Sequence, residues 1–451
     1  MPKRPPKTRI GRLAKLSGLT SRVSSSYLGQ RVKGAFQDAE IREKALSKLH
    51  LQNAERVVDT MGALKGAAMK VGQSLALAID GVDVPPEVSR ILSKLHDSAE
   101  PVPFEDIRAT VEEELGGTLE DLFLSFDEEP LGSASLAQAH AAQLPDGTQV
   151  VVKALYAGIE NSVDADLGAL RSLMVTSRML RRDPAEVTAM FDEVRTRLHE
   201  ELDYYKEAAH LEEFHAAYEG VEGIRIPKTY PSHCTGRVLT MDRLIGCSAE
   251  DFAASASPEA KQRAGDLLVQ TFYDMTYRLR ALHADPHGGN YLFAPDGSVG
   301  IIDFGCVKRF DMYWIAHYAE MALGFIDDDM DRAMPKAMEV GILAKRDPPA
   351  EDVLRDVAQT VCTPLMVPHY TCGASEDTVT ARMARLAPSV IRYPSLQSPP
   401  DLIFLHRSLG GIYALLRKLG HSHDYGTLFR RHAEHAIGVA EGTIKDGTPV
   451  A

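Results

Sequence analysis

The chain has 451 residues, enough for a large core and two or three domains or lobes. Its hydrophobic content of 44% and charged content of 25% are typical of a soluble globular protein, and its net charge of −13 argues against general affinity for nucleic acid. The five Cys residues are odd in number and form no C-x-x-C pair. This argues against a disulfide framework or a zinc ribbon and favours reduced thiols in the cytoplasm.

The first segment of the chain, residues 1–40, is strongly basic. Residues 1–35 contain nine Lys or Arg and no Asp or Glu. Because basic side chains alternate with Ile10, Leu13 and Leu16, one interpretation is an amphipathic anchor that makes peripheral contact with an anionic membrane. The alternatives are a solvated tail or a helix packed on the acidic body of the protein. We expect no secretory signal and no transmembrane helix, since the sequence has no run of 18 apolar residues.

Helical periodicity follows this basic segment. It predicts helices over residues 40–80, 87–95 and 104–115. Pro85-Pro86 ends the first of these helices and Gly116-Gly117 ends the last.

The hydrophobic period then changes to that of strands. Strands are predicted over residues 122–126, 135–143 and 149–155, the last two joined by a turn at 145–147. The remaining elements are a helix over 186–218, a strand over 237–241, and helices after Pro258 that are interrupted by one short hairpin of 291–293 and 299–303.

Two short motifs carry the strongest chemical signal. His283 to Asn290 is H-A-D-P-H-G-G-N, and Ile301 to Gly305 is I-I-D-F-G. The spacing of Asp285, Asn290 and Asp303 is that of the phosphoryl-transfer loops of protein kinases. One carboxylate orients the acceptor there, and an amide and a second carboxylate hold Mg²⁺ against the phosphates of ATP. Short pieces of these motifs, such as Asp-Pro-His or Gly-Gly-Asn, are also common in ordinary turns. Both motifs in this order, however, predict a nucleotide site.

Together with the order of elements, these motifs predict an α+β, bilobal, protein-kinase-like fold with an added N-terminal helical extension. The active cleft is expected between the lobes. We predict four segments: the basic segment 1–40, a helical extension over 41–120, a kinase-like N-lobe over 121–245 and a mainly helical C-lobe over 246–451.

A kinase-type site also needs a lysine on a strand and a glutamate on a helix to hold it. Lys153 lies in Val-Val-Val-Lys-Ala, where the valines indicate a buried strand, so a lone ammonium would be costly and a carboxylate partner is expected. Glu201, Asp203 and Glu207 are the candidates. Because Glu201 and Asp203 are two positions apart, we expect different partners for this pair and for Glu207. A solvated acidic helix face is the alternative.

The position of a glycine-rich loop is taken by Pro130 to Gln138, in which only Gly132 is glycine. Ala134 and Ser135 carry a Cβ, so the backbone cannot approach phosphates as freely as in a kinase. A Walker A loop is excluded, because the chain contains no Gly-Lys dipeptide.

Four motifs together resemble the UbiB/AarF family of atypical protein-kinase-like proteins, over nearly all of residues 45–420. They are Lys70-Val-Gly-Gln73, which is the family's K-x-G-Q signature, the alanine-rich loop Ser133 to His140, Glu201-Leu-Asp203-Tyr with Glu207-Ala, and the pair His283 to Asn290 with Asp303-Phe-Gly305.

The resemblance implies roles for these residues. Lys153 would bind the ATP phosphates with Glu207 holding it, and Asp285 would be the catalytic carboxylate. Asn290 and Asp303 would hold Mg²⁺.

It also implies that Ala134 and Ser135 lie at the nucleotide and that Met241 to Leu244 form a hinge against the adenine. Lys70, with Gln73, would project into the cleft as a further catalytic residue that faces Glu201 and Asp203. The extension that carries it would then cover the docking place of a protein substrate.

The chain departs from the family pattern at Gly288, where a proline is usual, and at Asp242, where a glutamate is usual. No Ala-Pro-Glu follows Asp303. The resemblance therefore implies an ATP- and Mg²⁺-dependent atypical kinase or ATPase, acting on a small molecule or lipid or supporting isoprenoid quinone metabolism. A nucleotide-binding pseudokinase scaffold without turnover is the alternative. A metallohydrolase with His283, Asp285 and His287 as ligands is a third and weaker interpretation.

Overall fold

The computed structural model describes residues 102–450 apart from 135, 161–162, 165, 169–170 and 172–183, together with the isolated positions 18, 22, 25, 26, 49 and 52. The basic segment and the helices predicted before residue 100 fall outside the described residues, apart from these isolated positions. So do Lys70, Gln73 and Ser135. The chain divides into two compact units: residues 1–209 with 229–243, and residues 210–228 with 244–451.

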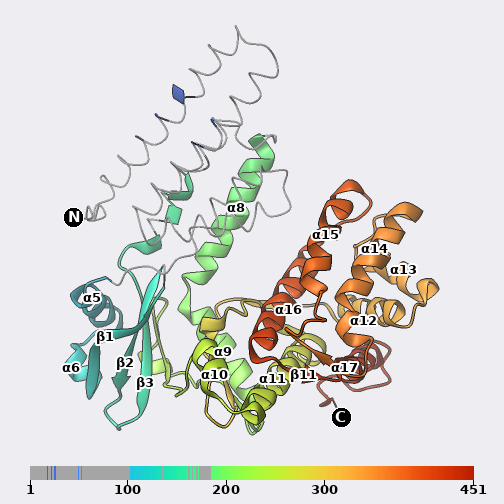
Figure 1. Ribbon diagram of the computed structural model, residues 1–451. Helices are drawn as coiled ribbons and strands as arrows, with labels where there is room; N and C mark the ends of the chain where they lie inside the picture. The colour runs from blue at the N-terminus through green and yellow to red at the C-terminus, as the bar shows by residue number, and fades with distance from the viewer. Residues whose placement is uncertain are drawn as a thin grey trace. The chain divides into compact units, whose positions relative to one another are not determined.

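The first unit is built on a four-stranded antiparallel sheet (Figure 1), in the order β1-β2-β3-β5. Its strands are β1 (Ser125–Ser133), β2 (Ala137–Gln143), β3 (Gln149–Leu155) and β5 (Val238–Asp242). Its helices are α5 (Phe104–Leu115), α6 (Leu119–Leu122), α8 (Pro184–Glu201) and the first turns of α9 (Tyr204–Tyr218), with a 3₁₀ turn η2 (Pro231–His233).

Helix α5 covers one face of this sheet and forms its core. Ile107 and Val111 are one helical turn apart and fully buried, and they pack in one cluster with Val150, Val152 and Ala154 of β3. The alternation of these β3 residues places them on one face of the strand. Gly116 ends α5 in the left-handed conformation, at φ 75°.

Helix α5, strand β3 and the turn before β3 have the limits predicted for them. Of the strand predicted over 122–126, only Ser125 and Phe126 are strand residues, at the start of β1. Leu122 is instead the end of α6, whose first turn is capped by the Thr118 side chain, which accepts a hydrogen bond from the Asp121 N–H. The remainder of β1 was missed, because its Pro130 and Gly132 are typical of loops; they are accommodated at the sheet edge by shifts in register.

The helix predicted over 186–218 is two helices, α8 and α9. The break falls at Leu202 and Asp203, where the Asp203 carboxylate accepts a hydrogen bond from the Tyr205 N–H at 3.1 Å and so caps α9.

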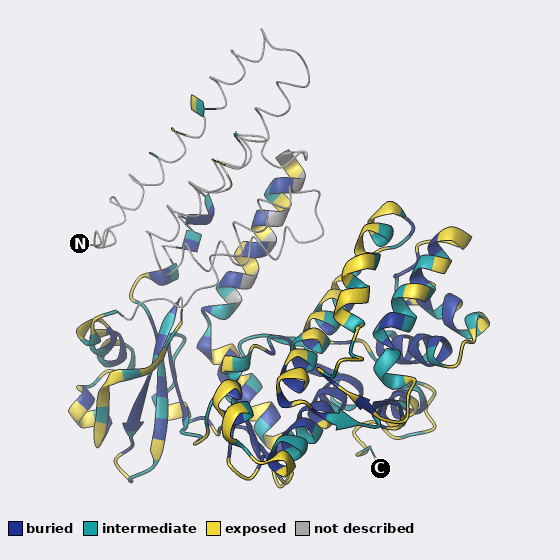
Figure 2. Cartoon of the chain, in the orientation of Figure 1, coloured by how far each residue is buried: buried dark blue, intermediate teal, exposed yellow. Residues whose placement is uncertain are grey.

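The second unit is mainly helical. Its helices are α10 (Ala249–Ser255), α11 (Pro258–Tyr273), α12 (Met312–Ile326), α13 (Met330–Glu339), α14 (Pro348–Val361), α15 (Val379–Arg392), α16 (Pro400–Leu419) and α17 (Tyr425–Ala440). Figure 2 shows that α12 is largely buried, whereas α15 carries no buried residue.

Short strands and turns connect these helices. The strands are β4 (Ile224–Arg225), β6 (Ala281–His283), β7 (Tyr291–Phe293), β8 (Val299–Ile301), β9 (Val307–Arg309), β10 (Tyr370–Thr371) and β11 (Ser422–His423), and the turns are a π-helical turn η3 (Asp274–Arg278) and the 3₁₀ turns η4 (Gly288–Asn290) and η5 (Thr363–Leu365). They pair as β4-β8-β7, β6-β9 and β10-β11.

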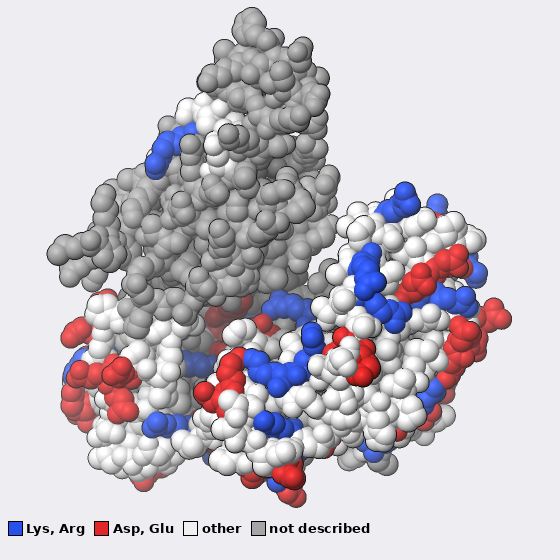
Figure 3. Space-filling view, in the orientation of Figure 1, with Lys and Arg blue, Asp and Glu red and all other residues white. Residues whose placement is uncertain are grey.

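On the face of the second unit shown in Figure 3, acidic and basic side chains are interspersed. Among the described helices of the chain, none is long and apolar enough to cross a membrane.

Candidate active site

In the first unit, Lys153 forms a buried ion pair. Its Nζ lies 2.7 Å from Glu207 Oε1, and the two side chains are 14% and 7% exposed. Lys153 is in the middle of β3, paired with Ala139 of β2 and with Leu239 of β5, so the strand on each side holds it in place. The structure thus brings together the strand lysine and one of its three candidate partners.

Lys153 is buried for a different reason from the one inferred from the sequence, which was that the neighbouring valines lie in a buried strand. Val150 and Val152 are buried on the face of β3 that α5 covers, and side chains alternate along a strand, so Lys153 points to the opposite face. Because Glu207 lies in the first turn of α9, its carboxylate reaches that opposite face.

Asp203 has a different position from Glu207. It lies between two helices, with Glu201 ending the preceding one, and it caps the helix that carries Glu207. The three acidic residues therefore do not lie along one helix. Since Lys70 falls outside the described residues, its predicted place opposite Glu201 and Asp203 stays a prediction.

The alanine-rich stretch from Ser133 to His140 is not all loop: Ser133 ends β1, Ala137 to His140 begin β2, and only the residues between them connect the two strands. The exposed Ala134 donates its backbone N–H to the Ala137 carbonyl at 2.8 Å, and its carbonyl accepts from the Tyr156 hydroxyl at 3.0 Å. A kinase glycine loop offers such N–H groups to phosphates. Here one of them is used inside the hairpin. No atom of the described residues lies within 4 Å of a Cβ built on Gly132, so packing against them does not require glycine there.

The predicted hinge lies where the chain passes from the first unit to the second. Met241 is a buried residue of β5, and Leu244 is the first residue of the returning second unit. Between them, the Arg243 N–H donates to the Gln149 carbonyl at 3.1 Å, and the Asp242 carboxylate accepts from the Tyr230 hydroxyl at 2.6 Å. Contact of Met241 and Leu244 with adenine stays a prediction.

In the second unit, two pairs of strands bring the two signature motifs together. β6 pairs antiparallel with β9, and the Ala284 N–H continues this pairing by donating to the Cys306 carbonyl at 2.9 Å. β7 pairs with β8, and the Ile302 N–H donates to the Asn290 carbonyl at 3.0 Å. The loop 285–290 and the loop 303–305 are thus bound to each other at both ends.

Asn290 and Asp303 lie at the same end of the β7–β8 hairpin, because Asn290 directly precedes β7 and Asp303 follows β8 by two residues. The Asn290 amide nitrogen donates to the Asp285 carbonyl at 2.8 Å, which turns its Oδ1 the other way. One carboxylate oxygen of Asp303 accepts from the Gly305 N–H at 3.0 Å. An amide oxygen and a carboxylate are hard oxygen ligands, so these two residues fit a Mg²⁺ ion.

Asp285 is held by the loop and by α16. Its carbonyl accepts from the His287 N–H at 2.7 Å as well as from Asn290. Its carboxylate Oδ1 lies 2.8 Å from a guanidinium nitrogen of Arg407, with both side chains more than one third exposed. The carboxylate therefore remains accessible while one oxygen is paired.

Behind the loop, His283 is buried next to the phenylalanine of the second motif. Its ring centroid is 5.4 Å from that of Phe304, which is fully buried and stacks on Phe214 at 4.5 Å. The Tyr291 hydroxyl lies 3.2 Å from His283 Nδ1, and burial raises the pKa of this tyrosine, so it stays protonated and can donate. His283 thus orients the loop from inside the core.

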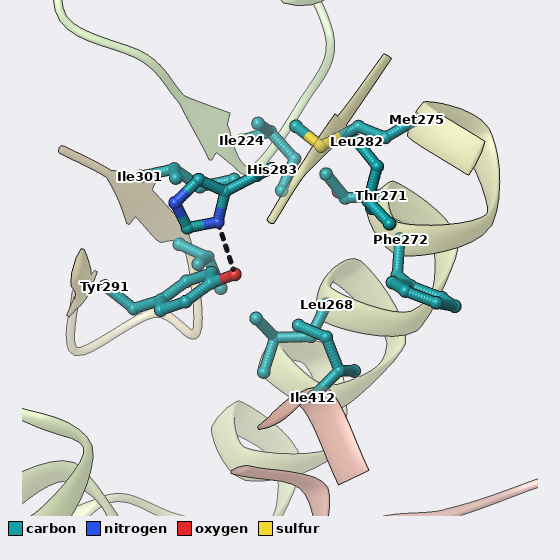
Figure 4. A pocket seen from close by; sticks show the side chains of 11 residues that line it. Ile224, Leu268, Thr271, Phe272, Met275, Leu282, His283, Tyr291, Ile301 and Ile412 are labelled. Carbon is teal, nitrogen blue, oxygen red and sulfur yellow. Dashed lines mark hydrogen bonds between the residues drawn. The ribbon is translucent and has the colours of Figure 1, made fainter. Parts of the chain in front are cut away.

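Figure 4 shows His283 and Tyr291 beside a small apolar cavity. Residues from α11, β6, β8 and α16 line it, among them Leu268, Leu282 and Ile412. Its volume is about 10 Å³, close to the lower limit for one water molecule, so it is not a nucleotide pocket.

The side of α16 that faces this loop was not assigned a role from the sequence. Besides Arg407, the Ser408 hydroxyl donates to the His283 carbonyl at 3.5 Å. A Cβ on Gly411 would lie 2.3 Å from Pro286 Cγ, so only glycine lets the helix pass this close. The sequence did contain a sign of this close approach, because the Gly410-Gly411 pair lies inside a helical pattern. The residue that Gly411 approaches, Pro286, is more than 120 positions away in sequence, so it could not be identified.

The third interpretation, a metal bound by His283, Asp285 and His287, does not fit. His287 Nδ1 accepts from the Gly289 N–H, His283 is buried against Tyr291, and Asp285 pairs with Arg407. Within the described part of the chain, the one group of three metal-ligating side chains that converge lies elsewhere.

A strand lysine paired with a helix glutamate, together with two strand-bound loops at kinase spacing, defines a protein of the kinase-like class. Residues 94–337 match the ABC1 atypical kinase-like domain. The chain is 28% identical over 422 residues to the atypical kinase COQ8B, mitochondrial, of Rattus norvegicus, covering 93% of this chain and 79% of that protein. It is 30% identical over 380 residues to the probable protein kinase UbiB of Xylella fastidiosa (strain M23), covering 82% and 67%.

The chain therefore belongs to the ABC1/UbiB family of atypical kinases, which confirms the family expected from the four motifs. A solved structure supports the fold. The Rv3197–erythromycin complex from Mycobacterium tuberculosis is similar with a TM-score of 0.61 and 25% sequence identity, covering 91% of this chain and 98% of that one. The kinase-like α+β fold class is thus confirmed, with an antiparallel sheet followed by a mostly helical part.

Proposed function

We propose that this protein binds MgATP and transfers or releases its terminal phosphoryl group. Lys153, held by Glu207, neutralises phosphate charge, and Asn290 and Asp303 hold the Mg²⁺ ion. Asp285 orients the acceptor. The magnesium ion supplies charge neutralisation of the phosphates when it is bound.

The observation that carries this proposal is the β7–β8 hairpin, which ends with Asn290 and Asp303 on the same side. In kinases, an amide and a carboxylate at this spacing share the metal ions of ATP. The ion pair of Lys153 supports it independently. Because burying two charges costs desolvation energy, a buried ion pair adds little to stability. The presence of the Lys153–Glu207 pair in the sheet is therefore better explained by a ligand that uses the ammonium.

The test is the stabilisation of the full chain by MgATP. A ligand that binds only the folded state raises the melting temperature, and Asp303→Asn should abolish most of this rise because it removes the carboxylate ligand. Asp296→Asn is a matched control, since Asp296 lies in the turn at the opposite end of the same hairpin. An undiminished rise in Asp303→Asn would show that the metal role is assigned wrongly.

A second candidate is a pseudokinase scaffold that binds nucleotide without turnover. Two observations favour it: the Ala134 N–H is used within its own hairpin, and one oxygen of Asp285 is paired with Arg407. Phosphate release, assayed with and without vesicles or quinone-like headgroups, separates the two. Release that is lost in Asp285→Asn would end the scaffold hypothesis, and the absence of both phosphate release and ADP formation under every condition would end the enzyme hypothesis.

We further propose that the acceptor is a small molecule, a lipid or water rather than a protein, and that the activity serves isoprenoid quinone or lipid metabolism. Membership in the ABC1/UbiB family supports this. The basic segment 1–40 would bring the cytoplasmic protein to an anionic membrane surface. Sedimentation with anionic but not with neutral vesicles, lost on removal of this segment, is the expected result.

A further inference from the structure

Three side chains far from the nucleotide motifs in sequence converge in the second unit. Asp266 is on α11, and His421 and His423 flank Ser422 of β11, in the region of the second unit that Figure 1 labels α11, β11 and α17. One ligand atom from each lies within 4.8 Å of the other two. Among the described residues, no other three His, Cys, Asp or Glu side chains come this close together.

The distances within this cluster are compatible with one shared metal ion as well as with hydrogen bonds. His421 Nε2 and His423 Nδ1 lie 3.0 and 3.1 Å from the same oxygen, Oδ1 of Asp266. Two ligand atoms of a tetrahedral zinc ion, each about 2.0–2.1 Å from the metal, are about 3.3 Å apart. Each of the two nitrogens therefore needs to move only a few tenths of an ångström away from Asp266 Oδ1, and all three atoms already lie within 4.8 Å of one another.

The other ring nitrogen of His421 has the partner that a metal ligand needs. Nδ1 lies 2.6 Å from the Tyr425 hydroxyl, so it can carry the proton while Nε2 faces the metal. Ligating histidines almost always have such an outer partner, which fixes the ring and its tautomer. The Tyr425 hydroxyl in turn lies 3.3 Å from Cys372 Sγ, so the arrangement continues into the core.

The carboxylate and the backbone between the two histidines are also held. The Gln262 amide nitrogen lies 3.3 Å from Asp266 Oδ1 and donates to the Ser422 carbonyl at 2.8 Å. Gly265 completes the frame, because a Cβ there would lie 2.2 Å from His421 Cδ2. Only glycine at this position of α11 allows the imidazole to lie against the helix.

The three candidate ligands differ in how far their side chains are buried. The His421 side chain is fully buried, whereas Asp266 and His423 are 32% and 29% exposed. The cluster is thus anchored from inside and open to solvent on one side. An ion can enter, and the fourth position of a tetrahedral ion is left to solvent.

We propose that Asp266, His421 and His423 form a binding site for a divalent transition-metal ion of the zinc class. Imidazole nitrogens select such ions over Mg²⁺, which prefers an all-oxygen shell, so this site is chemically different from the one at Asn290 and Asp303. The ion would tie β11 and the start of α17 to α11, across 155 positions of the sequence. This proposal is independent of the proposed function.

The test uses the full chain, stripped of metal with a chelator and titrated with Co²⁺. Tetrahedral Co²⁺ with nitrogen ligands absorbs strongly in the visible range, whereas an all-oxygen octahedral site does not. The expected result is a saturable visible band with one ion per chain, which Zn²⁺ abolishes by competition. His423→Gln should lose the band, and Tyr425→Phe should weaken binding by about 10–100-fold. Asp303→Asn should retain it, because it affects only the proposed magnesium site.

A matched control is His317→Gln, which removes a partly buried histidine from α12 in the same unit. It should bind Co²⁺ as the unaltered protein does. Because His423 is partly exposed, the His423→Gln protein should remain folded, and circular dichroism checks this. The proposal is overturned if the unaltered protein gives no visible band, or if a folded His423→Gln retains the full band. The contacts to Asp266 would then be hydrogen bonds only.

Discussion

The burial of His406 makes the stability of the second unit depend on pH. His406 Nε2 lies 2.9 Å from the Tyr318 hydroxyl, and burial lowers the pKa of His406 from 6.5 to about 4. The folded protein therefore keeps this imidazole neutral at pH values where the unfolded chain protonates it. The perturbation that isolates this effect is His406→Gln, which preserves a polar partner for Tyr318 but does not titrate.

The direction and the size of this change in the free energy of unfolding follow from proton linkage. Between pH 4 and 6.5 the unfolded chain binds more protons, so the stabilising contribution is complete above the unfolded pKa and is lost as the pH falls toward the folded one. With these two pKa values, the loss on going from pH 7.5 to 5 is roughly 2 kcal/mol. The neutral forms of His140, His432 and His435 are favoured by burial as well, but their effect is common to both proteins and cancels in the comparison.

The assay is urea-induced unfolding followed by tryptophan fluorescence. Trp314 is the one tryptophan of the chain, and it stacks on Tyr318 with ring centroids 5.7 Å apart. The signal therefore comes from the neighbourhood of His406. The unaltered protein should lose roughly 2 kcal/mol more than His406→Gln when the pH is lowered from 7.5 to 5.

Tyr318→Phe provides the control. It removes the hydroxyl but keeps the burial that causes the pKa shift, so it should retain the pH dependence of the unaltered protein. Equal pH dependence in His406→Gln and in the unaltered protein would refute the reasoning, because the group responsible would have to lie elsewhere.

Two further predictions concern residues that hold the proposed active site. Gly411→Ala should destabilise the second unit by about 1–3 kcal/mol and weaken stabilisation by MgATP, because its Cβ would overlap Pro286. Gly410→Ala is the control and should be tolerated, because a Cβ there has open space. Unfolding followed by tryptophan fluorescence compares the two variants. Glu207→Gln should cost about 3–5 kcal/mol, since it leaves the Lys153 ammonium in a mostly buried place without its carboxylate, and far-UV circular dichroism in urea measures this loss. Unchanged unfolding curves for either variant would contradict the corresponding contact.

Local patterns in the sequence were sufficient for much of this fold. The limits of β3 and α5 were predictable because each depends on its own residues: an alternating strand after a Pro-Asp-Gly turn, and a helix closed by Gly116. The same holds for the pairing of β7 with β8 around a second Pro-Asp-Gly turn. The spacing of Asp285, Asn290 and Asp303 predicted a kinase-type nucleotide site, and the four motifs together predicted the family, before any geometry was known.

Features that depend on distant partners were not predictable. The strands β6 and β9 are three residues long, too short to show a period, and each forms only because the other is present. The break between α8 and α9 was hidden by apolar residues that continue on both sides of it. No chemical role could be assigned to Arg407 or Asp266 from the sequence, because an arginine or an aspartate on a helix is ordinary until its partner is known.

Helix α16 also bears on where the functional protein ends. The stretch that matches the ABC1 atypical kinase-like domain stops at residue 337, whereas α16 begins at Pro400. A fragment cut to the matched stretch would keep the three motifs between Ser133 and Gly305 but lose Lys70-Val-Gly-Gln73, the support behind Pro286 and the cation beside Asp285. The matched stretch is thus shorter than the smallest piece of chain expected to keep its chemistry, and a fragment expressed for study should extend past residue 419.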